Sequence, residues 1–307
     1  MNELDEKSIE KKLIINDALF NNVYIINQNF DILPDNKKHY GASIDYLDIK
    51  ELRTEFLNEL IDSITDWVYS SEKYLEMKKR VMSKGKSEAA ANSEIISKSK
   101  NKFRKSKNPD EFLIQGQLGE LLLFHFIQRF MKAIPLLRKM PITTSNRHER
   151  FGADAIHYKK EGNKDIIILG EAKTYTSEYK FNEAFNDALE SILTTYYNHT
   201  EELNLYLHED FLDSDLDKIA ENYLNNLLPN PEVHLVSIVI YNEKSKINFS
   251  SKEDIQNQIH EIIEKRYRNF DKSKIDLNNN PILKRITYII FPIWDLKNFV
   301  KEFQQKI

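Results

Sequence analysis

The sequence of 307 residues contains no cysteine. A disulfide framework, a thiolate metal site and a cysteine nucleophile are therefore excluded. The sequence also lacks a G-x-S-x-G motif and a His-x-x-x-His pair, so neither a serine hydrolase nor a zinc-binding helix is indicated. Any metal that the chain binds must be held by oxygen ligands or by imidazole.

Long apolar runs are missing as well. Stretches such as 121–124 and 166–169 are four residues long, whereas a helix that crosses a bilayer needs about 20 apolar residues. The first 16 residues mix acids with lysines and do not contain the apolar run of a signal peptide. We therefore expect a cytoplasmic protein without a membrane segment.

Glycine is scarce, with only seven residues in the whole chain. Two of them, Gly116 and Gly119, fall inside a strongly apolar helical pattern, where each glycine costs about 1 kcal/mol relative to alanine. This cost suggests that another element packs closely against that helix. Five of the seven lie in one short region: Gly116, Gly119, Gly152, Gly162 and Gly170.

The pattern of apolar residues predicts an α/β (α+β) protein with a mixed central sheet flanked by helices. We expect a mixed or mainly helical segment over 1–107, with a helix at 48–80 and a Lys/Ser-rich connector at 82–107, and a second domain over 108–307. The elements predicted in that domain are helices at 110–131, 182–197, 252–268 and from 295, and strands at 140–145, 152–158, 165–173, 233–241 and 285–293.

Two neighbouring strands carry the residues best suited to catalysis. Glu171 and Lys173 are two apart on one strand, so both side chains point to the same face. Four apolar residues precede them, which indicates a strand that is buried on both sides. Charged groups in such a place are costly unless they pair or bind an ion. Asp154 lies on the preceding strand of the same predicted hairpin, so the two acids and the lysine should converge.

A third acid, Glu120, lies in the most apolar helix of the chain. Carboxylate oxygens from Asp154, Glu171 and Glu120, completed by water and phosphate oxygens, would make a magnesium site, in which Mn²⁺ could replace Mg²⁺. The metal would polarise a phosphoryl group and help to generate hydroxide. Lys173 would orient or deprotonate the attacking water and offset the developing charge.

Structural roles are the alternative for each of these residues. A Glu-x-Lys pair on a strand is most often a surface ion pair, and a buried helix glutamate can be held by a backbone amide. The order of the acids and the lysine along the chain nevertheless favours an active site. We assign structural roles to His125, His157 and Tyr175.

The order of these residues along the chain, a helix glutamate, a strand aspartate and then a strand Glu-x-Lys, resembles that of the PD-(D/E)xK nuclease superfamily. Asp154 stands at the place of the aspartate, and residues 171–173 at the place of the (D/E)xK motif. Glu120 matches the acidic residue that is often found on the first core helix of that superfamily. Ala153 stands where the superfamily most often has proline. The resemblance implies a restriction-endonuclease-like core and hydrolysis of phosphodiester bonds in DNA.

A narrower resemblance is to the HamA family, the nuclease subunits of the Hachiman anti-phage defence system. It rests on three segments, 119–127, 152–158 and 169–175, and covers about residues 110–200. The resemblance implies a metal-dependent DNase that works beside a helicase subunit, HamB, as a suspected heterodimer. The helicase would restrain the nuclease until aberrant DNA is sensed.

The formal net charge of −4 hides blocks of opposite sign. Residues 73–107 have a net charge of +9 and residues 127–150 of +5, whereas residues 176–234 have −11. The basic blocks suit contact with DNA phosphates, although the first also fits a solvated linker. The acidic segment 201–217 could dock a partner or block the site. Our candidate DNA-binding residues, which lead into the strand of Asp154, are Lys139, Arg147, His148 and Arg150.

We therefore expect a magnesium-dependent DNA endonuclease whose cleavage is independent of base sequence, since no base-reading motif is recognisable. Two alternatives stay open. One is a stand-alone restriction endonuclease of the type II kind, which would form dimers and cut at specific sequences. The other is a non-catalytic DNA-binding or regulatory subunit of a defence complex.

Overall fold

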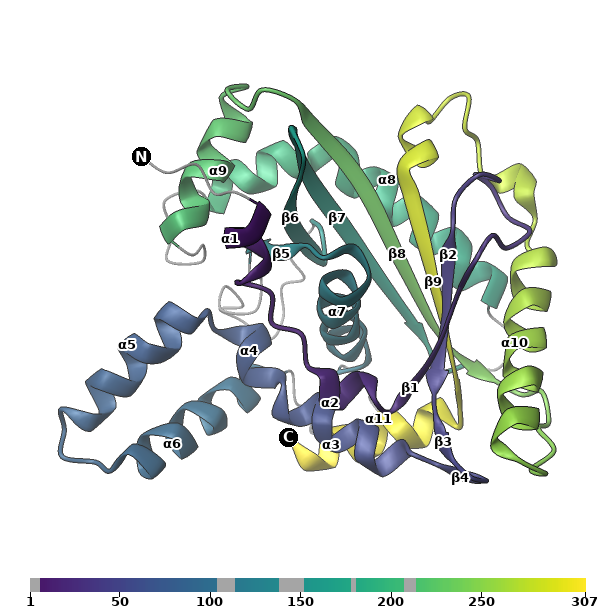
Figure 1. The fold of residues 1–307 in the computed structure, drawn as a ribbon, viewed down its shortest axis with the longest axis horizontal. Helices are drawn as coiled ribbons and strands as arrows, with labels where there is room; N and C mark the ends of the chain where they lie inside the picture. Colours follow the sequence, from purple (N-terminus) through teal and green to yellow (C-terminus); the bar gives the residue numbers. More distant parts are fainter. Residues whose placement is uncertain (1–5, 104–113, 138–151, 178–180, 207–213) are drawn as a thin grey trace.

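The computed structural model describes residues 6–103, 114–137, 152–177, 181–206 and 214–307. Within these ranges, a seven-stranded sheet is covered by helices on both faces (Figure 1). The strands are β1 (Val23–Gln28), β2 (His39–Ile44), β5 (Ile134–Leu137), β6 (Ala155–Glu161), β7 (Lys164–Tyr175), β8 (Pro231–Glu243) and β9 (Ile286–Trp294), with a separate pair β3 (Tyr46–Leu47) and β4 (Lys50–Glu51).

The helices fall into an N-terminal group and a group that alternates with the strands. A π-helical turn (Ile127–Met131) extends α7, and two short 3₁₀ turns (Lys272–Lys274 and Pro281–Arg285) precede β9. The α-helices are α1 (Glu6–Glu10), α2 (Asp17–Phe20), α3 (Arg53–Asp62), α4 (Ile64–Val68), α5 (Ser71–Met82), α6 (Glu88–Lys100), α7 (Gln115–Phe126), α8 (Phe181–Tyr206), α9 (Ser214–Leu224), α10 (Lys252–Arg268) and α11 (Leu296–Lys306).

The sheet is mixed, as expected from the sequence. Its strand order is β1-β2-β9-β8-β7-β6-β5. The four central strands β2, β9, β8 and β7 run parallel to one another, and β1, β6 and β5 pair antiparallel at the two sides. The expected α/β class with a mixed central sheet between helices is therefore confirmed, and it is consistent with a restriction-endonuclease-like core.

Each central strand is buried on both faces because each face has its own helical layer. Helices α3, α4, α7 and α11 pack on one face against side chains such as Ile168 and Ile238. Helices α8, α9 and α10 pack on the other face against side chains such as Ile167 and Val239. Alternate residues of β7 therefore face different helices, which explains its nearly continuous apolar sequence.

The predicted hairpin and the C-terminal elements are confirmed. Strands β6 and β7 pair antiparallel around a turn in which Gly162 has a φ of +57°, a conformation that glycine adopts without strain. Strands β8 and β9 and helices α10 and α11 lie within a few residues of their predicted positions. The predicted strand at 140–145 lies outside the described residues.

The N-terminal third differs from its prediction in two ways. The single helix expected at 48–80 is divided into α3, α4 and α5, because Ser63 and Ser70 interrupt it: the Ser63 hydroxyl donates to the Leu60 carbonyl, and Ser70 caps α5 by accepting from the Lys73 amide. The connector expected at 82–107 contains α6.

The N-terminal segment also contributes β1 and β2 to the same sheet as the predicted second domain. The sheet is therefore continuous across residue 107, and the domain boundary there stays a prediction. Helix α9 was not foreseen, because its acidic sequence hides an amphipathic pattern in which Leu216 and Ala220 are buried.

Glycines let α7 approach β7 closely. A Cβ at Gly119 would lie 2.5 Å from Thr174 Oγ1 and 3.3 Å from Ala172 Cβ, and one at Gly170 would lie 2.8 Å from Ile127 Cδ1. The expected close packing is confirmed at Gly119. At Gly116, the described residues outside its own helix place no atom within 4 Å of an added Cβ.

None of the helices in the described ranges has both the length and the apolar character that a membrane span requires.

The two helix glycines make a matched test of this packing. Gly119→Ala should lower the free energy of unfolding by about 1–3 kcal/mol, because the added methyl group collides with Thr174. Gly116→Ala should leave it unchanged or raise it by up to about 1 kcal/mol, because only helix propensity changes there. Urea denaturation of the two variants measures both values, and equal effects would contradict the close contact.

Candidate active site

Asp154 and Glu171 face each other across two neighbouring strands. The Asp154 amide donates to the Gly170 carbonyl at 3.0 Å, and Ala155 lies opposite Gly170 in the β6–β7 register. Asp154 comes one residue before Ala155, and Glu171 comes one residue after Gly170. The antiparallel register therefore places Asp154 opposite Glu171, with both acids on one face. The Ala172 amide also donates to Asp154 Oδ2 at 2.9 Å, and this bond orients the carboxylate toward β7.

Lys173 completes the predicted cluster. Its Nζ lies 2.9 Å from Glu171 Oε1. Glu171 is only 3% exposed, whereas Lys173 is half-buried. Burial by itself would lower the pKa of Lys173, but the carboxylates of Glu171, Asp154 and Asp187 outweigh it and raise that pKa above its ordinary value. The lysine is therefore a charged donor at neutral pH and is poorly suited to remove a proton from water.

Helix α8 supplies hydroxyl groups that hold Glu171. Ser191 donates to Glu171 Oε1 at 2.6 Å and accepts a hydrogen bond from Lys173 Nζ at 3.3 Å. Thr195 donates to Glu171 Oε2 at 3.5 Å. Each carboxylate oxygen thus has a donor on the helix. Neither hydroxyl residue belongs to a recognisable sequence motif.

The matching of α8 and β7 has a simple geometric basis. Four helical residues rise about 6 Å and two strand residues about 6.6 Å. Helix residues at i, i+4 and i+8 therefore have nearly the same spacing as alternate residues of an antiparallel strand, so each helix residue can contact one strand residue. Asp187, Ser191 and Thr195 form such a series, and they meet Tyr175, Lys173 and Glu171 in turn.

Tyr175 closes this series with a structural contact. Its hydroxyl donates to Asp187 on α8. Burial, together with that carboxylate, raises the pKa of Tyr175 to about 12. The tyrosine is therefore a neutral hydrogen-bond donor that fixes α8 against the end of β7, which agrees with the structural role assigned to it.

Glu120 lies on the helix that covers the other face of β7. Its neighbour Gly119 packs against Ala172 and Thr174, which alternate along β7 with Glu171 and Lys173. Glu120 is half-buried. Its place as a third metal ligand stays a prediction.

The donor set at Asp154 and Glu171 is suited to a hard cation. Mg²⁺ keeps several waters and needs only one or two protein carboxylates when substrate phosphates complete its shell. Two opposed carboxylates on one face meet that requirement. Within the described ranges there is no group of three or more His, Asp or Glu side chains that could hold a metal ion, so a closed protein cage is not what these residues form.

Glu202 supports the backbone just before Asp154. It is 6% exposed, and its Oε2 accepts the Ala153 amide at 2.8 Å. Gly152 has a φ of +140°, and a Cβ there would lie 2.3 Å from the Glu202 carboxylate. Only glycine allows this contact. The one hint in the sequence was the glycine itself, because residues 152 and 202 are far apart along the chain.

The predicted DNA-binding residues Lys139, Arg147, His148 and Arg150 lie outside the described residues.

The two histidines given structural roles are buried. His125 Nε2 lies 2.7 Å from Ser63 Oγ, and burial lowers the pKa of His125 to about 3. His157 points to the face opposite Asp154 and packs against Phe124 on α7. Both structural assignments are confirmed.

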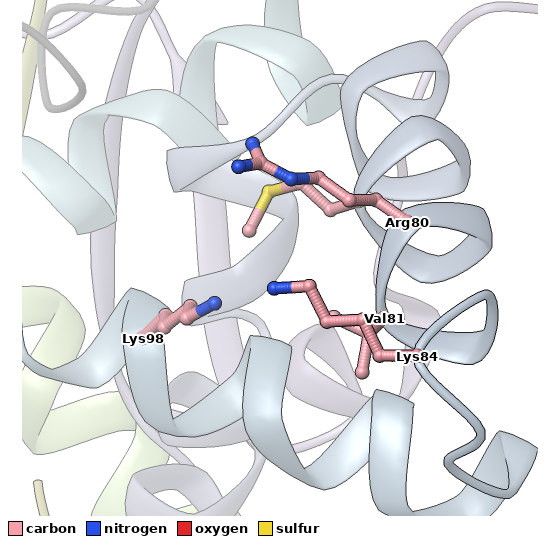
Figure 2. A pocket seen from close by; sticks show the side chains of 5 residues that line it. Arg80, Val81, Lys84 and Lys98 are labelled. Carbon is pink, nitrogen blue, oxygen red and sulfur yellow. The ribbon is translucent and has the colours of Figure 1, made fainter.

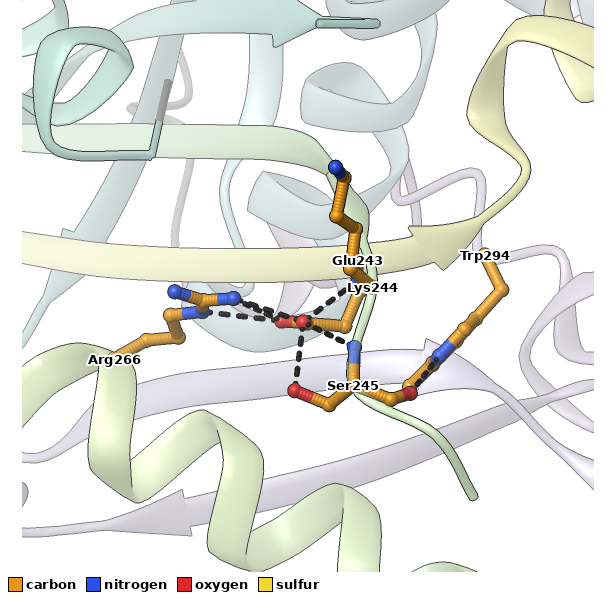
Figure 3. A network of polar contacts seen from close by, with 5 residues as sticks. All are labelled: Glu243, Lys244, Ser245, Arg266 and Trp294. Atoms are coloured by element: carbon orange, nitrogen blue, oxygen red, sulfur yellow. Dashed lines mark hydrogen bonds and ion pairs between the residues drawn. The ribbon is translucent and has the colours of Figure 1, made fainter. Parts of the chain in front are cut away.

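A second buried carboxylate, Glu243, lies at the carboxyl end of β8 and is already saturated with donors (Figure 3). Arg266 binds both of its oxygens at 2.8–3.0 Å. The Lys244 and Ser245 amides and the Ser245 hydroxyl donate at 2.8–3.0 Å. Burial raises the pKa of Glu243, but these donors outweigh it and keep the pKa below its ordinary value. The network ties α10 to the strand end and leaves little room for a ligand.

Comparison with known proteins gives one family. The family model described as HamA matches residues 17–307, which include every element from α2 to α11. No curated protein matches the chain.

The hydroxyl contacts to Glu171 can be tested through stability. Ser191→Ala should lower the free energy of unfolding by about 1–2 kcal/mol, since a buried carboxylate loses a donor. Thr194→Ala is the matched control, because that exposed hydroxyl donates only to the Glu190 carbonyl of its own helix. Chemical denaturation should show a change below about 0.5 kcal/mol for the control. If Ser191→Ala leaves the free energy of unfolding unchanged, the result would contradict the hydrogen bond from Ser191 to Glu171.

Proposed function

The chain belongs to the HamA family, and from this premise we propose that it is the nuclease subunit of a Hachiman anti-phage defence complex. Its activity would be metal-dependent hydrolysis of phosphodiester bonds in DNA. Family membership supports the role in defence, and the residues of β6, β7 and α8 support the chemistry.

One observation carries the proposal of catalysis. Asp154 and Glu171 lie opposite each other on adjacent strands, with Lys173 Nζ 2.9 Å from Glu171. Holding the buried Glu171 beside the half-buried Asp154 and Lys173 is costly for a purely structural purpose, because apolar residues of similar size would stabilise the sheet at least as well. Charged groups gathered in this way are typical of functional sites.

The residues divide the proposed work among them. A bound Mg²⁺ would polarise the phosphoryl group and lower the pKa of a coordinated water. Asp154 and Glu171 would hold that ion. The Ala172 amide keeps Asp154 in place, and Ser191 and Thr195 keep Glu171 in place. Lys173 would orient the water and offset negative charge that develops on the phosphate.

The proposed substrate is DNA cut without regard to base sequence. No base-reading motif is recognisable in the sequence, and Glu171 and Lys173 of the described cluster contact each other and Ser191. Contacts to phosphates would then determine where the chain binds.

The proposed partner is a HamB-like helicase subunit. Family membership supports a multi-subunit defence system. A helicase that restrains the nuclease would explain how an enzyme without base specificity spares the DNA of its own cell.

A non-catalytic subunit is the second candidate, and the ion pair itself favours it. Glu171 is paired with Lys173, Ser191 and Thr195, so its charge is compensated without a metal. A fold that keeps this network for stability alone would bind DNA but not cleave it.

Substitutions at the cluster separate the two candidates. Glu171→Gln and Lys173→Gln should each reduce magnesium-dependent degradation of plasmid DNA at least about 100-fold, because electrostatic stabilisation of the reacting phosphate is lost. Glu232→Gln is the control. It removes a carboxylate at the opposite end of the same sheet, where Glu232 pairs with Lys164.

The assay is run on the purified chain with Mg²⁺, with Mn²⁺ and with EDTA. The control should cleave as fast as the wild type. Equal, metal-independent rates for wild type and both cluster variants would reject the site. A wild type that binds DNA but never cleaves it, with or without the helicase, would favour the non-catalytic subunit.

Addition of the helicase subunit tests the proposed restraint. We expect the purified complex to degrade intact plasmid at least about tenfold more slowly than an equal amount of the free chain, because the partner limits access to the site. Supplying DNA with single-stranded ends should restore the rate. If the complex cleaves intact plasmid as fast as the free chain, the hypothesis that the helicase restrains the nuclease is wrong.

A further inference from the structure

Helices α5 and α6 form a basic hairpin at the edge of the molecule. Both are capped by serine: Ser70 accepts from the Lys73 amide, and Ser87 accepts from the Ala90 amide. Residues 71–102 contain nine Lys or Arg and four Glu. The hairpin is therefore a stable element with an excess of positive charge.

The hairpin extends away from the sheet (Figure 1). It is anchored where the end of α6 meets α4, through a 3.0 Å hydrogen bond between the hydroxyls of Thr65 and Ser99 and through the tilted ring contact of Trp67 with Phe103. The distal part is fixed mainly by its own seam, in which Val81, Ala91 and Ile95 are buried. Its outer surface is thus available to a ligand without any change in the core.

A pocket of about 150 Å³ opens between the two helices (Figure 2). Arg80 and Lys84 reach it from α5 and the turn that follows, and Lys98 reaches it from α6, so that three cations point into one space. Met77 and Val81 are the other lining residues, and no acid lines the pocket.

Two of these cations differ from their neighbours in how they are paired. Three of the other lysines of the hairpin bind glutamates, in the pairs Lys73–Glu76, Lys78–Glu88 and Lys86–Glu94. Lys98 pairs with Glu94 at 2.6 Å. Among the described residues, Arg80 and Lys84 have no carboxylate partner within 4.0 Å, although both are exposed. Cations gathered without counter-charges repel one another, and an anionic ligand would relieve that repulsion.

We propose that this pocket binds a backbone phosphate of DNA, the proposed substrate of the nuclease site. The inference rests on the proposed function for its choice of polyanion. A guanidinium and two ammonium groups arranged around a small cavity suit the two charged, non-bridging oxygens of a phosphodiester.

The two sides of the hairpin favour nucleic acid over an acidic protein at this pocket. The exposed large apolar side chains of the hairpin are Leu75, Met82 and Ile96. Leu75 and Met82 are seven residues apart and share one face of α5, while Arg80 lies on the other side of that helix and Lys84 lies in the turn that follows it. A protein interface would need apolar anchors, and the pocket side presents none of these three.

The experiment measures binding in the absence of cleavage. Wild-type full-length chain in EDTA is titrated against a fluorescein-labelled 30-base-pair duplex of random sequence, over a range of salt concentrations. The pocket variant is Arg80→Gln/Lys84→Gln. The control, Lys79→Gln/Lys102→Gln, also removes two positive charges from the hairpin, but at positions that do not line the pocket. All four positions are solvent-accessible or at a helix end, and unchanged melting temperatures confirm that each variant is folded.

The pocket variant should bind about tenfold more weakly at 0.1 M salt, and its plot of log K against log salt should be shallower by about one, because one phosphate contact is lost. The control should change the affinity less than threefold. Equal weakening of pocket and control variants would overturn the proposal, because it would show only a non-specific charge effect. The proposal is also overturned if the pocket variant binds DNA normally but loses binding to poly-L-glutamate, since an acidic protein would then be the ligand.

These outcomes are separate from those that test nuclease activity. If the wild type binds duplex through the pocket but degrades no DNA with Mg²⁺, the pocket assignment stands and the catalytic proposal fails. If the wild type cleaves and the pocket variant binds like the control, the catalytic proposal stands and the pocket assignment fails.

Discussion

The compensation of the buried Glu171 carboxylate is the constraint on which the candidate site depends. Glu171 lies in a central strand that is covered on both faces, where an uncompensated charge would cost several kcal/mol. Lys173, Ser191 and Thr195 provide that compensation. Because two of the three come from α8, the position of that helix along β7 is set by polar contacts as well as by apolar packing. The same contacts hold the carboxylate in one orientation, which is what a catalytic ligand requires.

The two faces of β7 illustrate how one strand serves two purposes. Toward α7 it presents Gly170, Ala172 and Thr174, small residues that let the helix pack closely. Toward α8 it presents Glu171 and Lys173, which need polar partners. A strand with a period of two can satisfy both helices at once. Both faces contribute an apolar core, and the charged groups are confined to the last residues of β7 on the face toward α8.

The parts of the site that were predictable depend on short sequence separations. Asp154, Glu171 and Lys173 lie on one hairpin, whose turn at Gly162 and alternating pattern determine the register. The division of the helix expected at 48–80 was missed, because Ser63 and Ser70 look like ordinary polar positions in an amphipathic pattern. Ser191, Thr195 and Glu202 were also missed. Their roles depend on the angle and register at which α8 crosses β7, and no local pattern encodes that geometry.

By itself, the sequence determined the chemistry that is available to this chain. The absence of cysteine restricts any metal to oxygen or imidazole ligands, and the period of two in β6 and β7 places two carboxylates and a lysine on one face. The tertiary structure decided which groups satisfy those charges, and it turned a lysine-rich segment into a hairpin with a pocket. The physical reason is that backbone periodicity is local, whereas the partners of a buried charge are brought together only when distant segments pack.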